Sequence, residues 1–145
     1  MAASFFNKVL VAVDGSEQAV RAVDMAVRMA ESSVIGSVTL FNVYDSGSVD
    51  VRKLHSAEKL DILRENSQAL LKEYEKKFTS IGVPCHLKTA GGEAASLILD
   101  LVQNSGDFDL IMLGSRKLNK FQEITLGSVS NKVSRLVKVP VMIIK

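Results

Sequence analysis

The sequence predicts a doubly wound α/β domain, with helices on both faces of a five-stranded parallel sheet. Short apolar runs without polar interruption, such as Val9–Val13, are typical of strands buried on both faces. Segments with apolar residues at helical spacing separate these runs, and this alternation implies right-handed crossovers between parallel strands. With 145 residues, 47% of them hydrophobic, the chain suits one domain over residues 1–145 with one substantial core.

The first half of the chain carries two predicted strands, each followed by a helix. Val9–Val13 ends at turn residues, where Ser16 can cap the next helix. Val38–Val43 is the second strand, and Ser46–Asp50 is a loop-like connection after it. Apolar positions at helical spacing mark the first helix at Ala19, Val23, Ala26, Val27 and Ala30, and the second at Leu60, Leu63, Leu70, Leu71, Tyr74, Phe78 and Ile81.

The second half continues the alternation. The predicted strands are Cys85–Thr89, Asp109–Leu113 and Val141–Ile144, and a polar segment runs from Gly114 to Gly127. Gly82 and Pro84 end the preceding helix, Gly91 and Gly92 lead into the next one, and Pro140 precedes the last strand. The two predicted helices carry apolar residues at Ala94, Ala95, Ile98, Leu101 and Val102, and at Val129, Val133, Leu136 and Val137.

Composition argues against several classes of protein. A formal charge of +2 from 18 basic and 16 acidic residues lacks the basic excess typical of nucleic-acid binding. The apolar runs are far shorter than the roughly 20 residues that span a bilayer, so we expect no membrane segment. The N-terminus does not resemble a secretory signal, and Cys85 alone cannot form an internal disulfide. We therefore expect a cytoplasmic protein. His55 and His86 have no metal-ligand spacing, so no metal site is expected.

The ends of the predicted strands indicate where a ligand would bind. In open parallel sheets, ligands bind beyond the carboxyl ends of strands, where the winding direction reverses. Asp14 follows the first strand directly, and its carboxylate could accept hydrogen bonds from a ribose hydroxyl or an exocyclic amine. The alternative is that Asp14 and Ser16 only cap the helix that follows.

The segments around Gly114 and Gly127 are candidates for phosphate binding. Glycine allows close backbone approach, and amides at a helix N-terminus, aided here by the Ser128 hydroxyl, favour anionic oxygens. The alternative is that both glycines simply mark joints between elements. The sequence contains neither Gly-x-x-x-x-Gly-Lys-Ser/Thr nor Gly-x-Gly-x-x-Gly, which argues against Walker-type NTPases and Rossmann dehydrogenases. It also lacks the Gly-x-Ser-x-Gly elbow of hydrolases.

Three sequence fragments together resemble the universal stress protein family over nearly the whole chain. They are Val11-Ala-Val-Asp-Gly-Ser16, Leu113-Gly-Ser-Arg116 and Leu126-Gly-Ser-Val-Ser130. The resemblance implies a parallel sheet in the order 3-2-1-4-5 and a homodimer. It also implies binding of ATP, ADP or AMP, with or without magnesium, by residues at the matching positions. The expected site residues are Ala12, Val13, Asp14, Val43, Leu113, Gly114, Arg116, Lys117, Gly127, Ser128, Val129 and Ser130.

Lys117 departs from the family pattern. Members that bind ATP have glycine, two residues, glycine, nine residues, then glycine followed by serine or threonine; here Lys117 occupies the second glycine position. A lysine there would cost roughly 1–2 kcal/mol if the backbone must be left-handed. Its ammonium group could instead attract phosphates, as Arg116 and Lys120 could. Its stem could also exclude the triphosphate. The sequence leaves these three effects open.

The resulting expectation is a stress-response module that acts by binding an adenine nucleotide and not by catalysis. A nucleotide-free dimeric scaffold of the same family is the first alternative, and a slow ATPase is the second. The last strand, Val141–Ile144, would lie at a sheet edge, and an open apolar edge invites pairing with another chain. We therefore expect a symmetric homodimer through this strand.

Overall fold

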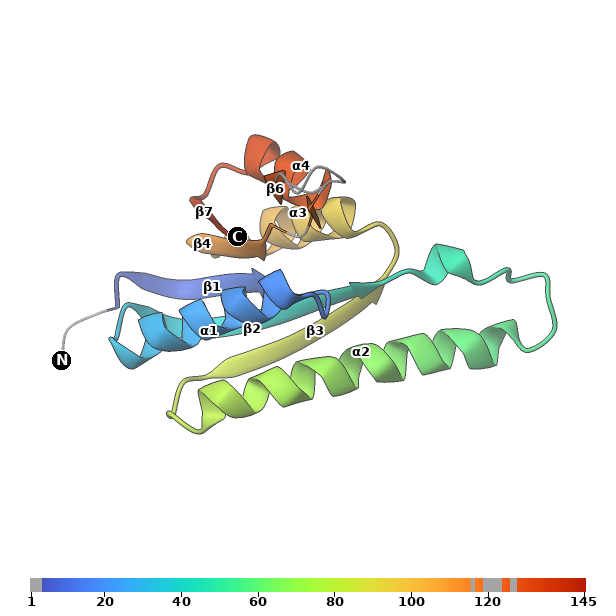
Figure 1. Cartoon of the computed structure of the whole chain (residues 1–145), viewed down its shortest axis with the longest axis horizontal. Coiled ribbons are helices and arrows are strands. Elements are labelled where there is room, and N and C mark those ends of the chain that lie inside the picture. Colours follow the sequence, from blue (N-terminus) through green and yellow to red (C-terminus); the bar gives the residue numbers. More distant parts are fainter. Residues whose placement is uncertain (1–3, 116, 119–123, 126–127) are drawn as a thin grey trace.

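A parallel five-stranded sheet in the order β3-β2-β1-β4-β7 forms the centre of the molecule (Figure 1). The computed structural model describes residues 4–115, 117–118, 124–125 and 128–145. The strands are β1 (Phe6–Ala12), β2 (Ile35–Tyr44), β3 (Cys85–Gly91), β4 (Leu110–Gly114) and β7 (Val141–Ile144). Every neighbouring pair in this sheet is parallel. This confirms the predicted fold class and strand order.

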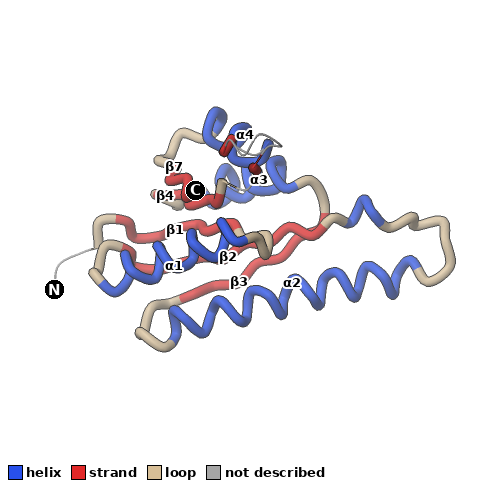
Figure 2. Tube along the Cα trace, viewed as in Figure 1, coloured by secondary structure: helices blue, strands red, loops and turns tan. Residues whose placement is uncertain are grey.

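Helices cover both faces of this sheet (Figure 2). One face packs against α1 (Glu17–Glu31) and α2 (Ser56–Thr79), and the other against α3 (Ala94–Ser105) and α4 (Ser128–Leu136). Ser16 caps α1 as predicted, since its hydroxyl accepts a hydrogen bond of 3.1 Å from the Ala19 amide. Among the described residues, no helix has the length and apolar character needed to span a bilayer.

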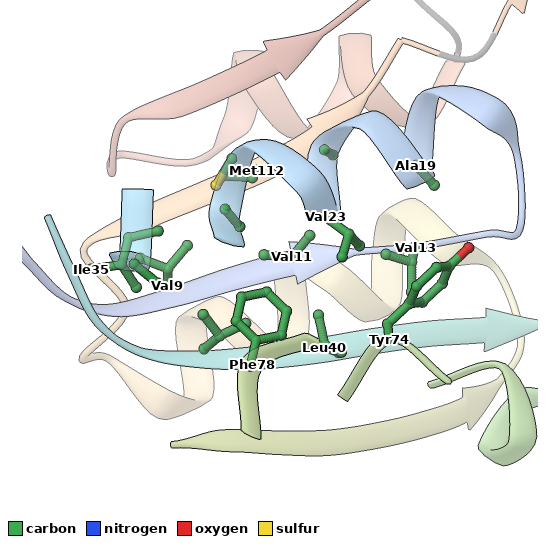
Figure 3. Close-up of a cluster of buried hydrophobic side chains, with 14 of the residues drawn as sticks. Val9, Val11, Val13, Ala19, Val23, Ile35, Leu40, Tyr74, Phe78 and Met112 are labelled. Carbon is green, nitrogen blue, oxygen red and sulfur yellow. The ribbon is translucent and has the colours of Figure 1, made fainter. Parts of the chain in front are cut away.

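The core lies in two layers, one on each side of the sheet. Figure 3 shows the first layer, in which Phe78 and Tyr74 of α2 lie among Val9, Val11 and Leu40 of the strands. Phe78 is fully buried, and truncation of such a side chain to alanine costs about 3–5 kcal/mol. The second layer joins the opposite sheet face to α3 and α4; its buried residues include Leu10, Phe41, Ile98, Ile111, Leu113 and Val133.

The structure differs from the predicted elements at a few boundaries. Ile81 was expected on the buried face of the long helix, but α2 ends at Thr79 and Ile81 is 37% exposed. Leu136, one of the apolar residues of the predicted last helix, is 53% exposed. Val133 and Val137, one helical turn apart, take the core side at the end of α4, so Leu136 points elsewhere. The polar segment after β4 contains a short antiparallel pair, β5 (Lys117–Leu118) and β6 (Ile124–Thr125).

Candidate functional site

The winding direction of the sheet reverses at β1, which lies between β2 and β4. The chain passes from β1 to β2 and β3 on one side and then returns to β4 on the other (Figure 1). Ala12, the last residue of β1, pairs with Phe41 of β2 and with Leu113 of β4. The residues that follow these strands therefore meet at the same carboxyl edge. This edge is where open parallel sheets bind ligands.

Val13 and Asp14 directly follow β1, and hydrogen bonds fix both residues. The Val13 amide donates to the Phe41 carbonyl at 2.9 Å. The Asp14 side chain is exposed, and its Oδ1 accepts from the Ser16 amide at 2.9 Å. Asp14 thus fixes the turn into α1, while Ser16 itself is the helix cap. The structure supports a local role for Asp14 and also places its carboxylate at the candidate edge.

Two buried polar residues, neither of them predicted from the sequence, hold this turn through hydrogen bonds. Asn42 of β2 donates through Nδ2 to the Val13 carbonyl at 2.6 Å. Ser67 of α2 donates its hydroxyl to Asn42 Oδ1, also at 2.6 Å. Both side chains are buried. The available signal was a polar residue at an apolar position: Asn42 lies between Phe41 and Val43 in the second strand, and Ser67 lies four residues from both Leu63 and Leu71 in the helix.

Gly114 occupies a crowded position at the end of β4. A Cβ atom there would lie 2.7 Å from the Gln18 carbonyl carbon and 2.8 Å from the Ala19 amide nitrogen. The first turn of α1 therefore approaches the Gly114 backbone directly. The Ser130 hydroxyl donates to the Gly114 carbonyl at 3.1 Å, and Ser130 is buried. This bond brings the start of α4 to the end of β4.

Other predicted site residues contribute mainly through packing and backbone position. Leu113 is buried in the second core layer, and Ala12, Val43 and Val129 are half-buried against that layer. Ser128 is the first residue of α4. Arg116 and Gly127 lie outside the described residues. Apart from Lys117 in β5, the described members of the predicted set thus lie in β1, β2, β4 and α4 or directly after β1.

Lys117 lies in β5, where it pairs with Thr125 of β6. Residues in an antiparallel ladder are extended, with negative φ. This arrangement requires no left-handed backbone at Lys117. The energetic cost of a left-handed lysine, which the sequence left open, therefore does not arise in this strand pair.

Glu93 adds a carboxylate at the carboxyl end of β3, where it caps α3. Its side chain accepts from the amides of Ser96 at 2.8 Å and Ala95 at 3.2 Å. The hydrogen bonds from Ser96 are the main reason that the pKa of Glu93 is lowered. The carboxylate of Glu93 thus already occupies the N-terminus of α3, where an anionic ligand could otherwise bind. Within the described part of the chain, no group of three His, Cys, Asp or Glu residues could hold a metal ion.

Comparison with known proteins adds independent information. Residues 5–145 match the model of the universal stress protein family. The chain is similar to the universal stress protein YxiE of Bacillus subtilis, with 32% identity over 149 residues that cover 97% of this chain and 99% of the relative. Its fold is similar to the universal stress protein UspA from Lactobacillus plantarum, with a TM-score of 0.82, 23% identity and coverage of 99% and 100% of the two chains.

Two further solved structures with the same fold hold ligands. A universal stress protein in complex with cAMP has a TM-score of 0.69 and 24% identity, with 96% of each chain covered. A family protein from Arabidopsis thaliana with AMP bound has a TM-score of 0.68 and 21% identity, with 96% of this chain and 91% of that chain covered. At these identities the likeness establishes the fold that the proteins share.

Proposed function

Because this chain belongs to the universal stress protein family, we propose that it binds an adenine nucleotide at the carboxyl edge of its sheet. It acts as a stress-response module through binding and not through turnover. The observation that carries this proposal is the meeting of Asp14, Gly114 and the start of α4 where the winding reverses. Proteins with the same fold that hold cAMP and AMP support adenine nucleotides as the ligand class.

Each part of the edge suits a different part of a nucleotide. Ala12 and Val43 supply half-buried apolar surface at the ends of β1 and β2, which suits an adenine ring. The side chain of Val13 is buried in the first core layer, so Val13 would contribute through its backbone. The exposed Asp14 carboxylate suits the hydroxyl groups of ribose. We place the phosphates at the start of α4, where Ser128 begins the helix and backbone amides favour anions. Arg116, Lys117 and Gly127 belong to this phosphate end in the proposal.

We favour binding over catalysis because we identify no activated nucleophile and no metal-ligand cluster among the described residues. Cys85 is half-buried, and burial raises the pKa of its thiol to about 12, so the thiol remains protonated and unreactive at neutral pH. The described residues contain no three-ligand metal cluster. Magnesium, where it takes part, would therefore arrive coordinated by the nucleotide phosphates.

Calorimetric titration of the purified protein with AMP, ADP, ATP and cAMP, each with and without magnesium, tests this proposal. Mass spectrometry of small molecules released from the protein provides a second readout that does not depend on added ligand. Saturable binding of at least one adenine nucleotide is expected, with guanine nucleotides as the control. Absence of both binding heat and co-purified ligand would contradict nucleotide binding. Hydrolysis of ATP on the time scale of an enzyme would instead favour the slow ATPase.

A nucleotide-free scaffold remains the second candidate, and Lys117 is the observation that favours it. This lysine stands at a glycine position of the ATP-binding pattern and lies in β5, three residues after Gly114. In this alternative, the lysine stem occupies space that a triphosphate needs. The protein would then act as a dimeric interaction module whose partners recognise its surface.

We also propose a symmetric homodimer that forms through β7 in the cytoplasm. β7 is one of the two edge strands of this sheet, and β3 is the other. The carbonyl of Pro140, directly before β7, accepts a hydrogen bond from the Ile111 amide of β4. The carbonyl of Ile144 accepts one from the Ser115 amide, directly after β4. Backbone groups alternate in direction along a strand, so those of Val141 and Ile143 point away from β4. Antiparallel pairing with the same strand of a second copy would satisfy them.

A further inference from the structure

The buried pair Asn42 and Ser67 connects α2 to the candidate nucleotide edge. Asn42 Nδ2 lies 2.6 Å from the Val13 carbonyl oxygen, and Ser67 Oγ lies 2.6 Å from Asn42 Oδ1. Asn42 belongs to β2 and Ser67 to α2, and Val13 directly follows β1. In sequence, 29 positions separate Asn42 from Val13 and 25 separate Ser67 from Asn42. As whole residues, Asn42 and Ser67 are 7% and 4% exposed. Both bonds are therefore shielded from water, which strengthens them.

Hydrogen-bond chemistry gives this pair a single orientation. The Val13 carbonyl can only accept, so the Asn42 amide must turn its NH₂ group toward it. The Asn42 carbonyl oxygen then faces α2 and requires a donor, which the Ser67 hydroxyl provides. A helical serine commonly bonds to the carbonyl one turn earlier in its own helix; Ser67 instead bonds across to the sheet. Neither residue could be replaced by an apolar residue without leaving a buried polar atom unpaired.

Ser67 also marks the point at which α2 meets the body of the protein. None of the residues from Ser56 to Asn66 is buried, and Figure 1 shows this half of α2 extending past the end of β3. Beyond Ser67, the buried residues Leu71, Tyr74 and Phe78 pack α2 onto the sheet. The first buried contact of the helix is therefore polar and leads, through Asn42, to the Val13–Asp14 peptide.

We propose that Asn42 and Ser67 are positioning residues that hold the Val13–Asp14 peptide and thereby set the affinity of the nucleotide site. This inference rests on the proposed function, because its consequence is nucleotide affinity. Asp14 is the next residue after the anchored carbonyl, and its Oδ1 is already fixed by the Ser16 amide. The two restraints together fix the carboxylate at the edge of the sheet. Loss of the Val13 anchor would displace Asp14 from hydrogen-bond geometry, and small displacements of a binding group weaken a site markedly.

The experiment compares Ser67→Ala and Asn42→Leu with Leu71→Val. Leu71 is one helical turn after Ser67, fully buried and without a polar side chain, so its variant disturbs the packing of α2 but leaves the two hydrogen bonds in place. Calorimetry with AMP is expected to show a loss of affinity of about fivefold for Ser67→Ala, and a larger loss for Asn42→Leu. Leu71→Val is expected to bind as the unchanged protein does.

A readout without nucleotide separates failure of this inference from failure of the proposed function. In ¹⁵N-edited NMR spectra of the free protein, Ser67→Ala is expected to shift the amide signals of residues 13–15 and to speed their hydrogen exchange, whereas Leu71→Val leaves them unchanged. If the two variants change the amide signals and hydrogen exchange of residues 13–15 equally, the positioning role is overturned. It is also overturned if Ser67→Ala changes neither. If the unchanged protein binds no adenine nucleotide, the proposed function fails, and the NMR comparison still decides whether the pair holds this peptide.

Discussion

The hydroxyl of Ser130 donates to the carbonyl of Gly114 across 3.1 Å, and this bond ties the start of α4 to the end of β4. On its other side, Gly114 touches the first turn of α1 at Gln18 and Ala19. One residue thus lies between two helices that cover opposite faces of the sheet. This explains why glycine is needed there even without a ligand.

Gly114→Ala is expected to destabilise the protein. The added Cβ would lie 2.7 Å from a backbone carbon of α1, so the helix must move, and such overpacking costs about 1–3 kcal/mol. Urea unfolding followed by circular dichroism measures the change in free energy. Gly47→Ala is the control, because its Cβ would meet only the Asp45 carboxylate oxygen at 3.3 Å. Equal stability of the two variants would contradict the close approach.

Asp14→Asn is expected to weaken nucleotide binding and to leave the turn into α1 intact. The amide oxygen can still accept from the Ser16 amide, but the charge available to ribose is lost. A charge-assisted hydrogen bond of this kind contributes about 1.5 kcal/mol, or about tenfold in Kd. Calorimetry with AMP tests this change.

Asp50→Asn provides the matched control for that measurement. Asp50 Oδ1 accepts from the Arg52 amide at 3.0 Å, two residues further along the chain, as Asp14 Oδ1 accepts from Ser16. Asp50 lies in the connection between β2 and α2, outside the candidate site. Retained affinity in Asp14→Asn, or an equal loss in Asp50→Asn, would argue against a role for Asp14 in binding.

Lys117→Gly distinguishes the nucleotide-binding protein from the nucleotide-free scaffold. If Lys117 attracts the phosphates, the glycine variant binds ATP more weakly than the unchanged protein does, while AMP binding changes less. If the lysine stem blocks the site, the variant gains ATP binding that the unchanged protein lacks. Calorimetry with ATP and AMP on both proteins decides between these outcomes. Our proposed function predicts the first.

Ile143→Lys is expected to convert the proposed dimer into a monomer that remains folded. Among the described residues, Ile143 is half-buried and packs against neither core layer, so the variant retains the core. A lysine on an edge strand opposes pairing with another chain. Light scattering coupled to size-exclusion chromatography measures the mass. Ile62→Lys, at a 55% exposed position of α2, serves as the control and should remain a dimer. If the unchanged protein is a monomer at micromolar concentration, the proposed interface is refuted.

The cap of α3 predicts a specific pH dependence of stability. The pKa of Glu93 is lowered in the folded protein, chiefly by hydrogen bonds from Ser96. A lowered folded-state pKa adds stability that is complete above the unfolded-state value, ordinarily 4.5, and is lost as the pH falls through the folded-state value. Because Glu93 is exposed, we expect this contribution to stay below about 1 kcal/mol, the usual size for a helix cap.

Glu93→Gln measures this contribution directly. The difference in unfolding free energy between the unchanged protein and the variant should be largest at neutral pH and should shrink on acidification below the ordinary glutamate value. Urea unfolding at a series of pH values gives this difference. A difference that does not depend on pH would contradict the charged cap.

Much of the fold could be predicted because its signals are local. The apolar run Val9–Val13, the cap at Ser16 and the glycines around β3 lie close in sequence to the elements that they define. The boundaries were less accurate: β2 begins at Ile35, three residues before the predicted Val38. Gly36 and Ser37 interrupt the apolar pattern there, but pairing of Ser37 with Lys8 of β1 retains them in the strand.

The sequence by itself determined the alternation of strands and helices, the ends of the strands where a ligand would bind, and the motifs that resemble the family. These features follow from side-chain periodicity and turn chemistry, which act over a few neighbouring residues. Only the tertiary structure decided that Asn42 bonds Val13, that Ser67 bonds Asn42, and that Gly114 touches α1. Such contacts depend on the register of the strands and on the path of the crossovers. Their partners are brought together by packing, which no local pattern specifies.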